Sequence, residues 1–214
     1  MTEVEALYPF LYADTSNIDA VLQEVRRSTV DKAKEIIALR RQVLAVDGAR
    51  LAECAEDMAE RFIAGGRLLT FGNGGSSTDS QDLASLFLSP GADRPLPAFG
   101  LTNDIAVVTA LSNDIGFDVV FSRQIAAFAR SGDIAVGLST SGNSANLLRA
   151  FDEAARRGLL TVGIAGYDGG KMAELDSIDY LFVVNSASVH RIQEAQTTIY
   201  HVLWELTRNI IDER

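Results

Sequence analysis

The sequence predicts an α/β protein built on a five-stranded parallel sheet, and two observations lead to this fold class. From residue 66 onward, short runs of continuous hydrophobic residues alternate with stretches of helical periodicity. Strands that are apolar along their whole length are typical of parallel sheets that helices cover on both faces. The expected strands are Leu68–Phe71, Ala98–Leu101, Ile134–Leu138, Leu160–Ile164 and Tyr180–Val184.

Helices are expected between these strands and after the last one. Polar or Gly/Ser-rich turns separate each strand from the periodic segment that follows it, as in repeated β–α units. The expected helices are Ser77–Leu88, Asp104–Leu111, Phe117–Ala129, Ala145–Arg157 and Val189–Ile211.

The first quarter of the chain has helical periodicity throughout, from about residue 16 to residue 62. Ser16 or Asn17 is expected to cap the first helix. Asp47-Gly48 is typical of a turn, so we expect it to divide the segment into a helical hairpin.

This hairpin has a large apolar surface and no polar chemistry, and it must pack against its own domain or a neighbouring subunit. We therefore predict two parts, a helical extension over residues 1–47 that serves oligomerisation and a ligand-binding domain over residues 48–214.

Composition excludes several classes of protein. The chain has 214 residues, with 19 basic and 29 acidic residues and a net charge of −10, which speaks against nucleic acid or an anionic membrane as a partner. The single cysteine, Cys54, excludes an intramolecular disulfide or a CxxC motif, and we expect it to be buried. No apolar run approaches the roughly 20 residues of a membrane span, and the first residues do not resemble a secretory signal. We expect a cytoplasmic protein.

Two strand-to-helix turns have the composition of anion-binding loops. Residues 72–77 read Gly-Asn-Gly-Gly-Ser-Ser, and residues 139–144 read Ser-Thr-Ser-Gly-Asn-Ser. Glycines let the backbone approach a ligand, while helix-start amides and hydroxyls donate hydrogen bonds to an anion. The alternative is that these residues only cap helices. Because two loops share this layout, we favour binding.

The ligand of these loops is expected to be a monophosphate on a neutral body, because neither loop contains Lys or Arg. The Walker A pattern is absent, since no Gly-Lys-Ser/Thr occurs. The dinucleotide pattern also fails, because Ser77 stands where a third glycine is required.

The last helix holds both histidines of the chain, His190 and His201, together with Gln193. Gln193 and His201 lie eight residues apart and can lean toward one side of the helix. Asp79 and Asp82 follow the glycine loop at i and i+3 and can face the same cavity. The alternatives are a buried structural histidine and acids that favour a helix N-terminus.

Four segments of the chain resemble the signature segments of the sugar isomerase (SIS) domain, and within it those of bacterial phosphoheptose isomerases. These segments are residues 72–77, residues 139–144, residues 166–171 (Gly-Tyr-Asp-Gly-Gly-Lys) and residues 191–194 (Arg-Ile-Gln-Glu). The resemblance implies a flavodoxin-like αβα sandwich and a sugar-phosphate ligand. It also implies a homotetramer with active sites between subunits, in which the N-terminal helices take part in assembly.

The resemblance also implies roles for single residues. By position, the family's acid/base histidine is His201. Its zinc ligands, present in some members, fall on Gln193 and His201, with Asp82 in the place of a third. Its sugar-phosphate contacts fall on Asn73, Gly74, Gly75, Asn113, Asp114, Ser139, Thr140, Ser141, Ser144 and Gln193.

The chain departs from the family where the family transfers protons. A His and a Glu of the family's glycine-loop helix are replaced by Asp82 and Leu86. Leucine cannot shuttle the proton of an enediol intermediate, which the Glu is proposed to do. Three hypotheses follow. The first is an aldose–ketose isomerase with His201 as one acid/base and Asp82 or Glu194 in place of the missing carboxylate. The second is a noncatalytic sensor or adaptor that binds another protein, and the third is an enzyme of different chemistry on a related sugar phosphate.

Overall fold

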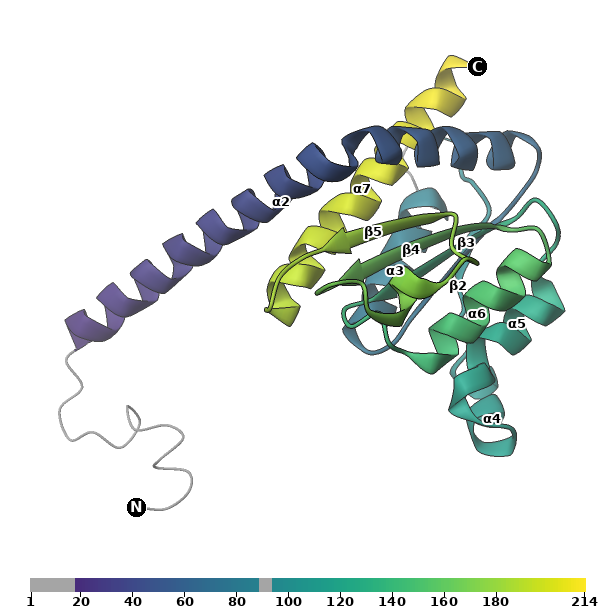
Figure 1. Cartoon of the computed structure of the whole chain (residues 1–214), viewed down its shortest axis with the longest axis horizontal. Coiled ribbons are helices and arrows are strands. Elements are labelled where there is room, and N and C mark those ends of the chain that lie inside the picture. Colours follow the sequence, from purple (N-terminus) through teal and green to yellow (C-terminus); the bar gives the residue numbers. More distant parts are fainter. Residues whose placement is uncertain (1–17, 89–93) are drawn as a thin grey trace. The chain divides into compact units, whose positions relative to one another are not determined.

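The fold is an α/β sandwich around five parallel strands, as the sequence predicts (Figure 1). The computed structural model describes residues 18–88 and 94–214. The strands lie in the order β2-β1-β3-β4-β5 and every pair is parallel. They are β1 (Leu68–Gly72), β2 (Ala98–Gly100), β3 (Ile134–Ser139), β4 (Leu160–Gly166) and β5 (Tyr180–Val184).

Helices cover both faces of this sheet. One face packs against α5 (Val120–Phe128) and α6 (Ala145–Arg156), where the rings of Phe121 and Phe151 both contact Phe71 of β1. The other face packs against α3 (Gly75–Leu88) and α7 (Val189–Glu213). Each strand residue therefore meets apolar side chains, which explains the continuous hydrophobic runs of the sequence.

Three short segments differ from the expected elements. The helix predicted over Phe117–Ala129 begins as a 3-10 turn, η2 (Phe117–Val119), before α5 starts. The helix after β2 is α4 (Ile105–Asp114), which Asp104 caps by accepting hydrogen bonds from the amides of Ala106 and Val107. A second 3-10 segment, η3 (Gly170–Glu174), follows β4.

The prediction of a helical hairpin is wrong, because residues Ile18–Ile63 form one continuous helix, α2. Asp47 lies inside this helix, is 6% exposed and pairs with Arg50 at 3.6 Å. A glycine inside a helix costs only about 1 kcal/mol relative to alanine, and burial of Leu51 and Cys54 one and two turns later offsets that cost. The expected caps Ser16 and Asn17 lie outside the described residues.

The chain divides into two compact units, residues 1–38 and residues 39–214. The buried residues of α2 all belong to the second unit and begin at Val43. In the first unit, Ile18, Val21, Leu22 and Val25 are exposed at helical spacing. This stripe is the apolar surface that the sequence predicts for assembly.

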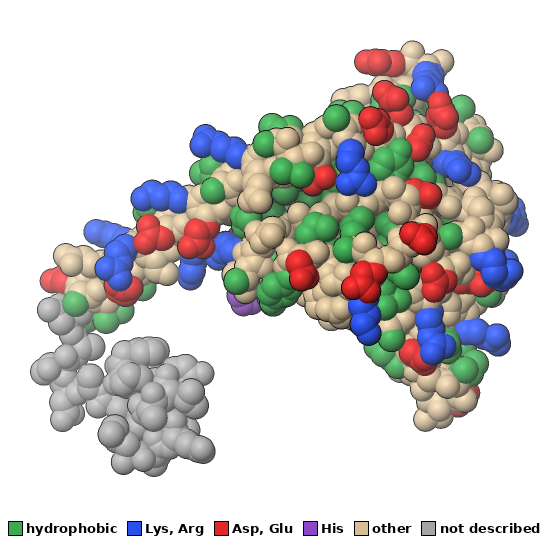
Figure 2. Space-filling model, in the orientation of Figure 1, with side chains coloured by type: hydrophobic (Ala, Val, Ile, Leu, Met, Phe, Trp, Pro, Cys, Tyr) green, Lys and Arg blue, Asp and Glu red, His purple; other side chains and the backbone are tan. Residues whose placement is uncertain are grey.

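Other expectations from composition can be compared with the structure. Cys54 is free and completely buried, as predicted, and burial raises the pKa of its thiol, so it is chemically inert. Acidic and basic side chains are interspersed over the visible face in Figure 2. Within the described part of the chain, no helix is both long and apolar enough to cross a bilayer.

The sheet order places the two predicted anion loops side by side. The chain leaves β1 toward β2 on one side and reaches β3 on the other, so the direction of winding reverses between β1 and β3. The ends of these strands are paired through Gly72 and Leu138. Ligands of open α/β sheets bind at such a switch point, at the carboxyl ends of the strands.

Candidate functional site

The glycine loop turns sharply from β1 into α3. A Cβ at Gly72 would clash with the carbonyl of Ser76, and Gly74 has a φ of +56°, so both positions favour glycine. Helix α3 begins at Gly75, and the amides of Ser76 and Ser77 donate to the carbonyls of Asn73 and Gly74 at 3.1 and 3.0 Å. The loop therefore closes on itself and forms one side of the candidate site.

The second loop joins β3 to α6 and keeps its hydroxyls near the helix start. The hydroxyl of Ser139 accepts a hydrogen bond from the amide of Gly142 at 3.0 Å. Ser144 occupies the N-cap position of α6, but its side chain makes no capping hydrogen bond. The capping alternative therefore does not account for Ser144, whose hydroxyl is available to a ligand.

The two loops are joined directly by a pair of amide side chains. Nδ2 of Asn73 donates to Oδ1 of Asn146 at 2.9 Å, and Nδ2 of Asn146 donates back to Oδ1 of Asn73 at 2.9 Å. Asn146 lies in the first turn of α6 and is 2% exposed. The two loops that the sequence singles out therefore lie in direct contact. Asn146 itself was not predicted, because its partner lies 73 residues away.

Helix α7 contributes Gln193 to the same place. The side-chain amide of Gln193 lies so close to Gly75 that a Cβ there would clash with it. Gly75 and Gln193, both predicted site residues, are thus brought together at the start of α3. One turn later, Gln196 is completely buried and donates to the carbonyls of Ser139 and Ile164 at 3.3 and 3.2 Å. It fixes α7 against the ends of β3 and β4.

His201 is partly buried and held in one orientation. Its Nδ1 lies 2.8 Å from the carbonyl oxygen of Thr197, one turn earlier in α7. A carbonyl can only accept, so Nδ1 carries a proton and donates, and Nε2 of the neutral ring is left as an acceptor. The ring also stacks on Tyr200, with 4.9 Å between centroids.

A cluster of acidic groups lies between α3 and α7. The hydroxyl of Tyr200 donates to Oδ2 of Asp82 at 2.8 Å. Oδ2 of Asp79 is buried without a hydrogen-bond partner, and burial, followed by the charge of Asp82, raises the pKa of Asp79 to about 6. Burial also raises the pKa of Tyr200. Leu86, one turn beyond Asp82 on α3, supplies only hydrocarbon.

Tyr200 could not be identified from the sequence. It stands among apolar residues of α7 and reads as a core aromatic, which in part it is, since it is 1% exposed. Only its contact with Asp82, 118 residues away, shows that it limits what this carboxylate can do.

Asn113 and Asp114 are not brought to the loops. They end α4, are exposed, and bond to each other, with Nδ2 of Asn113 donating to Oδ1 of Asp114 at 2.8 Å. No hydrogen bond in the described ranges links them to residues 72–77 or 139–144. Their role in ligand binding stays a prediction.

Two of the three predicted zinc ligands, Asp82 and His201, already make hydrogen bonds. Among residues 18–88 and 94–214, no three His, Cys, Asp or Glu side chains are grouped to hold an ion. Asp82 is engaged with Tyr200, and Nδ1 of His201 with a carbonyl. A zinc-binding histidine usually donates its other ring N–H to a carbonyl, as Nδ1 of His201 does here. Zinc binding by Gln193, His201 and Asp82 stays a prediction, and we derive no chemical step through a metal.

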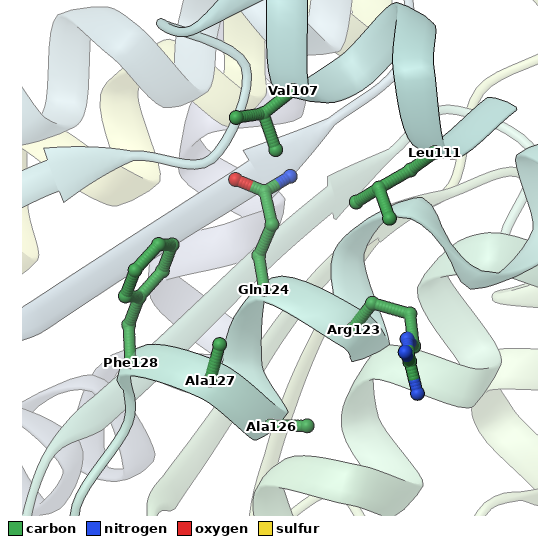
Figure 3. A pocket seen from close by; sticks show the side chains of 7 residues that line it. All are labelled: Val107, Leu111, Arg123, Gln124, Ala126, Ala127 and Phe128. Carbon is green, nitrogen blue, oxygen red and sulfur yellow. The ribbon is translucent and has the colours of Figure 1, made fainter.

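A pocket between α4 and α5 contains none of the predicted site residues (Figure 3). Its volume is about 410 Å³, and its walls are mainly apolar. The amide of Gln124 points toward Val107 within it, but its Nε2 already donates to the carbonyl of Leu101 at 2.9 Å. The lining residues are Val107, Leu111, Arg123, Gln124, Ala126, Ala127 and Phe128.

Comparison with known proteins identifies the family of the chain. The sequence profile of the SIS domain matches residues 33–166. A phosphoheptose isomerase of Nitratidesulfovibrio vulgaris is 40% identical over 193 residues, which cover 89% of this chain and 92% of the relative. One of Desulfovibrio desulfuricans is 45% identical over 177 residues, covering 82% of this chain and 83% of the relative.

Comparison with solved structures also finds phosphoheptose isomerases. The solved phosphoheptose isomerase of Neisseria gonorrhoeae superposes with a TM-score of 0.79 at 34% identity, covering 86% of this chain and 99% of the other. That of Francisella tularensis superposes with a TM-score of 0.77 at 28% identity, covering 94% of this chain and 100% of the other. Sequence profile, relatives and fold agree with one another: the chain belongs to the family of SIS-domain proteins and is similar to its phosphoheptose isomerases over most of its length.

Proposed function

We propose that this chain binds a seven-carbon sugar phosphate at the ends of β1 and β3 and interconverts its aldose and ketose forms. The observation that carries the proposal is the joining of the glycine loop to the second loop by Asn73 and Asn146. This pairing fixes the start of α3 beside the first amides of α6, with Gln193 held against the start of α3. The names of the relatives supply the substrate class.

The phosphate is assigned to residues 139–144. The uncommitted hydroxyl of Ser144, the hydroxyl of Ser141 and the first amides of α6 are the donors there. No Lys or Arg lies in either loop, so the phosphate is neutralised by hydrogen bonds and the helix dipole alone. Such a site suits a monophosphate on a neutral sugar.

The reaction needs a base that removes a proton from the carbon beside the carbonyl. The electron pair of that C–H bond forms the C=C bond of the enediol, while the carbonyl oxygen gains a proton. The neighbouring hydroxyl then loses its proton as the former carbonyl carbon is protonated, so the reaction is balanced without an oxidant. Nε2 of His201, left free by the bond of Nδ1 to Thr197, is assigned as one acid/base. Asp82 is assigned as the carboxylate partner in place of the Glu that Leu86 replaces.

A specific observation favours a second candidate, a noncatalytic sugar-phosphate sensor. Oδ2 of Asp82 accepts the hydroxyl proton of Tyr200, and the next turn of α3 offers the hydrocarbon of Leu86. A carboxylate that is engaged in this way is a poor proton shuttle. Binding would then be retained while turnover is lost.

One pair of measurements separates these candidates. The purified chain is assayed for turnover of sedoheptulose 7-phosphate, and its binding of the same compound is measured by calorimetry. Turnover supports the isomerase, and binding without turnover supports the sensor. If the compound neither binds nor reacts, both proposals are wrong.

A further inference from the structure

A second cavity lies at the same edge of the sheet, over the ends of β3, β4 and β5. Its volume is about 540 Å³, within the range of roughly 300–1,000 Å³ that is usual for ligand pockets. Three successive strand-to-helix loops line it, with polar side chains from each: Ser141, Asn143, Tyr167, Asp168, Asn185 and Ser186. No residue of the glycine loop lines it, nor does Gln193 or His201. It shares only Ser141 with the predicted phosphate contacts.

The wall formed by the first two loops is rigid. Nδ2 of Asn143 donates to the carbonyl of Ser141 at 2.9 Å, and Oδ1 of Asn143 accepts from the amide of Lys171 at 3.1 Å. Gly170 lies so close to the Ser141 carbonyl that a Cβ there would clash with it. The loops after β3 and β4 are therefore joined to each other by hydrogen bonds and close packing.

Tyr167 stands in this cavity with an unusual backbone. Its φ is +53°, and it is the only non-glycine residue in the described ranges with a positive φ. This conformation is strained for any residue with a Cβ, and glycine would adopt it freely. Such strain persists where the surroundings or a function require the side chain. Tyr167 is 37% exposed, so a ligand can reach it.

The remaining polar groups of the cavity are partly uncommitted. Oδ1 of Asp168 accepts from the amide of Gly170 at 3.1 Å, which leaves its second oxygen for a ligand. The hydroxyl of Ser186 accepts from the amide of Ser188 and can still donate. The side chain of Asn185 makes no hydrogen bond within the described part of the chain, so it offers a donor and an acceptor.

This lining selects a class of ligand. No Lys, Arg or His is among the residues that line the cavity, and Asp168 carries a negative charge, so an anion is disfavoured. Hydroxyl groups can donate to the carboxylate of Asp168 and accept from the amide of Asn185. An aromatic ring beside them suits the apolar face of a sugar ring.

We propose that this cavity binds a neutral carbohydrate without a phosphate group, as a second sugar site beside the phosphate loop. The proposal does not depend on the isomerase activity, because residues 72–77, Gln193 and His201 take no part in it. It also gives a role to the Gly166–Lys171 segment, which the proposed reaction does not use.

The test uses the full chain and unphosphorylated sedoheptulose as the probe in calorimetry. Wild-type protein is expected to show saturable binding. Tyr167→Gly and Asn185→Ala are each expected to weaken it about tenfold, the effect of losing a ring contact or a hydrogen bond. Glycine suits a φ of +53°, so Tyr167→Gly removes the side chain while the loop keeps its shape, which a thermal melt verifies.

Ser144→Ala is the matched control, because Ser144 belongs to the phosphate loop and does not line this cavity. It is expected to weaken binding of sedoheptulose 7-phosphate and to leave binding of the unphosphorylated sugar unchanged. The proposal is overturned if the neutral sugar does not bind saturably, if its affinity survives both cavity variants, or if Ser144→Ala abolishes it. Binding of sedoheptulose 7-phosphate is measured in a separate titration. If the phosphorylated sugar fails to bind, only the proposed function is contradicted.

Discussion

Asn73 and Asn146 form a reciprocal pair of hydrogen bonds, both 2.9 Å long, that joins the loop after β1 to the helix after β3. Each amide satisfies the other, so neither is left with unpaired polar atoms in a partly buried place. The pair fixes the distance between two helix N-termini and hence the width of the proposed phosphate site.

The first prediction concerns this pair. Asn73→Ala and Asn146→Ala each leave one amide unpaired, so the double variant should lose less stability than the sum of the single variants. We expect a coupling of about 1–2 kcal/mol in the free energy of unfolding. Urea unfolding of the wild type and three variants measures it. Strict additivity would show that the pair contributes nothing.

The second prediction concerns the phosphate loop. Ser141→Ala combined with Ser144→Ala should weaken sugar-phosphate binding by about 1–3 kcal/mol, because hydrogen bonds to a charged group are lost. Calorimetry with sedoheptulose 7-phosphate measures the change. Ser85→Ala, which removes an exposed hydroxyl of α3 that bonds to the Gln81 carbonyl, is the control and should bind normally. An unchanged affinity in the double variant would refute the assignment.

The third prediction rests on Leu86. We expect isomerase activity at least about 10²-fold below that of relatives with Glu at this position, because a positioned acid/base group is missing. Leu86→Glu should raise turnover, and more so when combined with Asp82→His. Leu86→Gln has nearly the same shape but no basic oxygen, and it should not raise turnover. Wild-type turnover comparable to that of the relatives would require another base.

The fourth prediction concerns the dependence of stability on pH. The pKa of Asp79 in the folded chain is about 6, raised from 3.8, so the folded state binds this proton more tightly than the unfolded state. Its contribution to stability is complete below about pH 4 and is lost as the pH rises through about 6.

Asp79→Asn should therefore be more stable than the wild type at pH 8, by about 1–2 kcal/mol after allowance for solvent screening, and equal to it below pH 4. Denaturant unfolding at several pH values measures the difference. Asp176→Asn, which removes an exposed carboxylate, is the control. A difference between Asp79→Asn and the wild type that does not vary with pH would contradict the assignment.

The fifth prediction concerns assembly. Ile18 and Val25 are 68% and 55% exposed at the ends of an apolar stripe, and such a stripe on a helix favours contact with another helix. We expect the full chain to be a homotetramer and a chain lacking residues 1–38 to be a monomer or to aggregate. Light scattering measures both masses. An unaltered tetramer after the deletion would show that the stripe is not the interface.

The sheet could be predicted from the sequence because its strands are buried on both faces. Each strand is a continuous apolar run, and each predicted end lies within two residues of the observed one. The prediction of a helical hairpin was wrong because Asp47-Gly48 has the composition of a turn. In the structure, the ion pair of Asp47 with Arg50 and the burial of the following turns keep the helix continuous. Local composition does not reveal such tertiary effects.

The loops of the site were predictable for a different reason. Glycine and hydroxyl residues after a strand serve either to cap a helix or to bind an anion, and their repetition in residues 72–77 and 139–144 favoured binding. Asn146 and Tyr200 were not predicted, because each has an ordinary role in its own helix. Their importance comes from partners 73 and 118 residues away, and these contacts depend on the strand order.

The close approach of Gln193 to Gly75 has a consequence for how such proteins can diverge. A Cβ on Gly75 would meet the amide end of Gln193, so a larger residue there would turn this flexible side chain away from the start of α3. The two positions are therefore coupled through the site rather than through the packing of α7. In related chains, a residue other than glycine at the first position should be accompanied by a shorter side chain at the second.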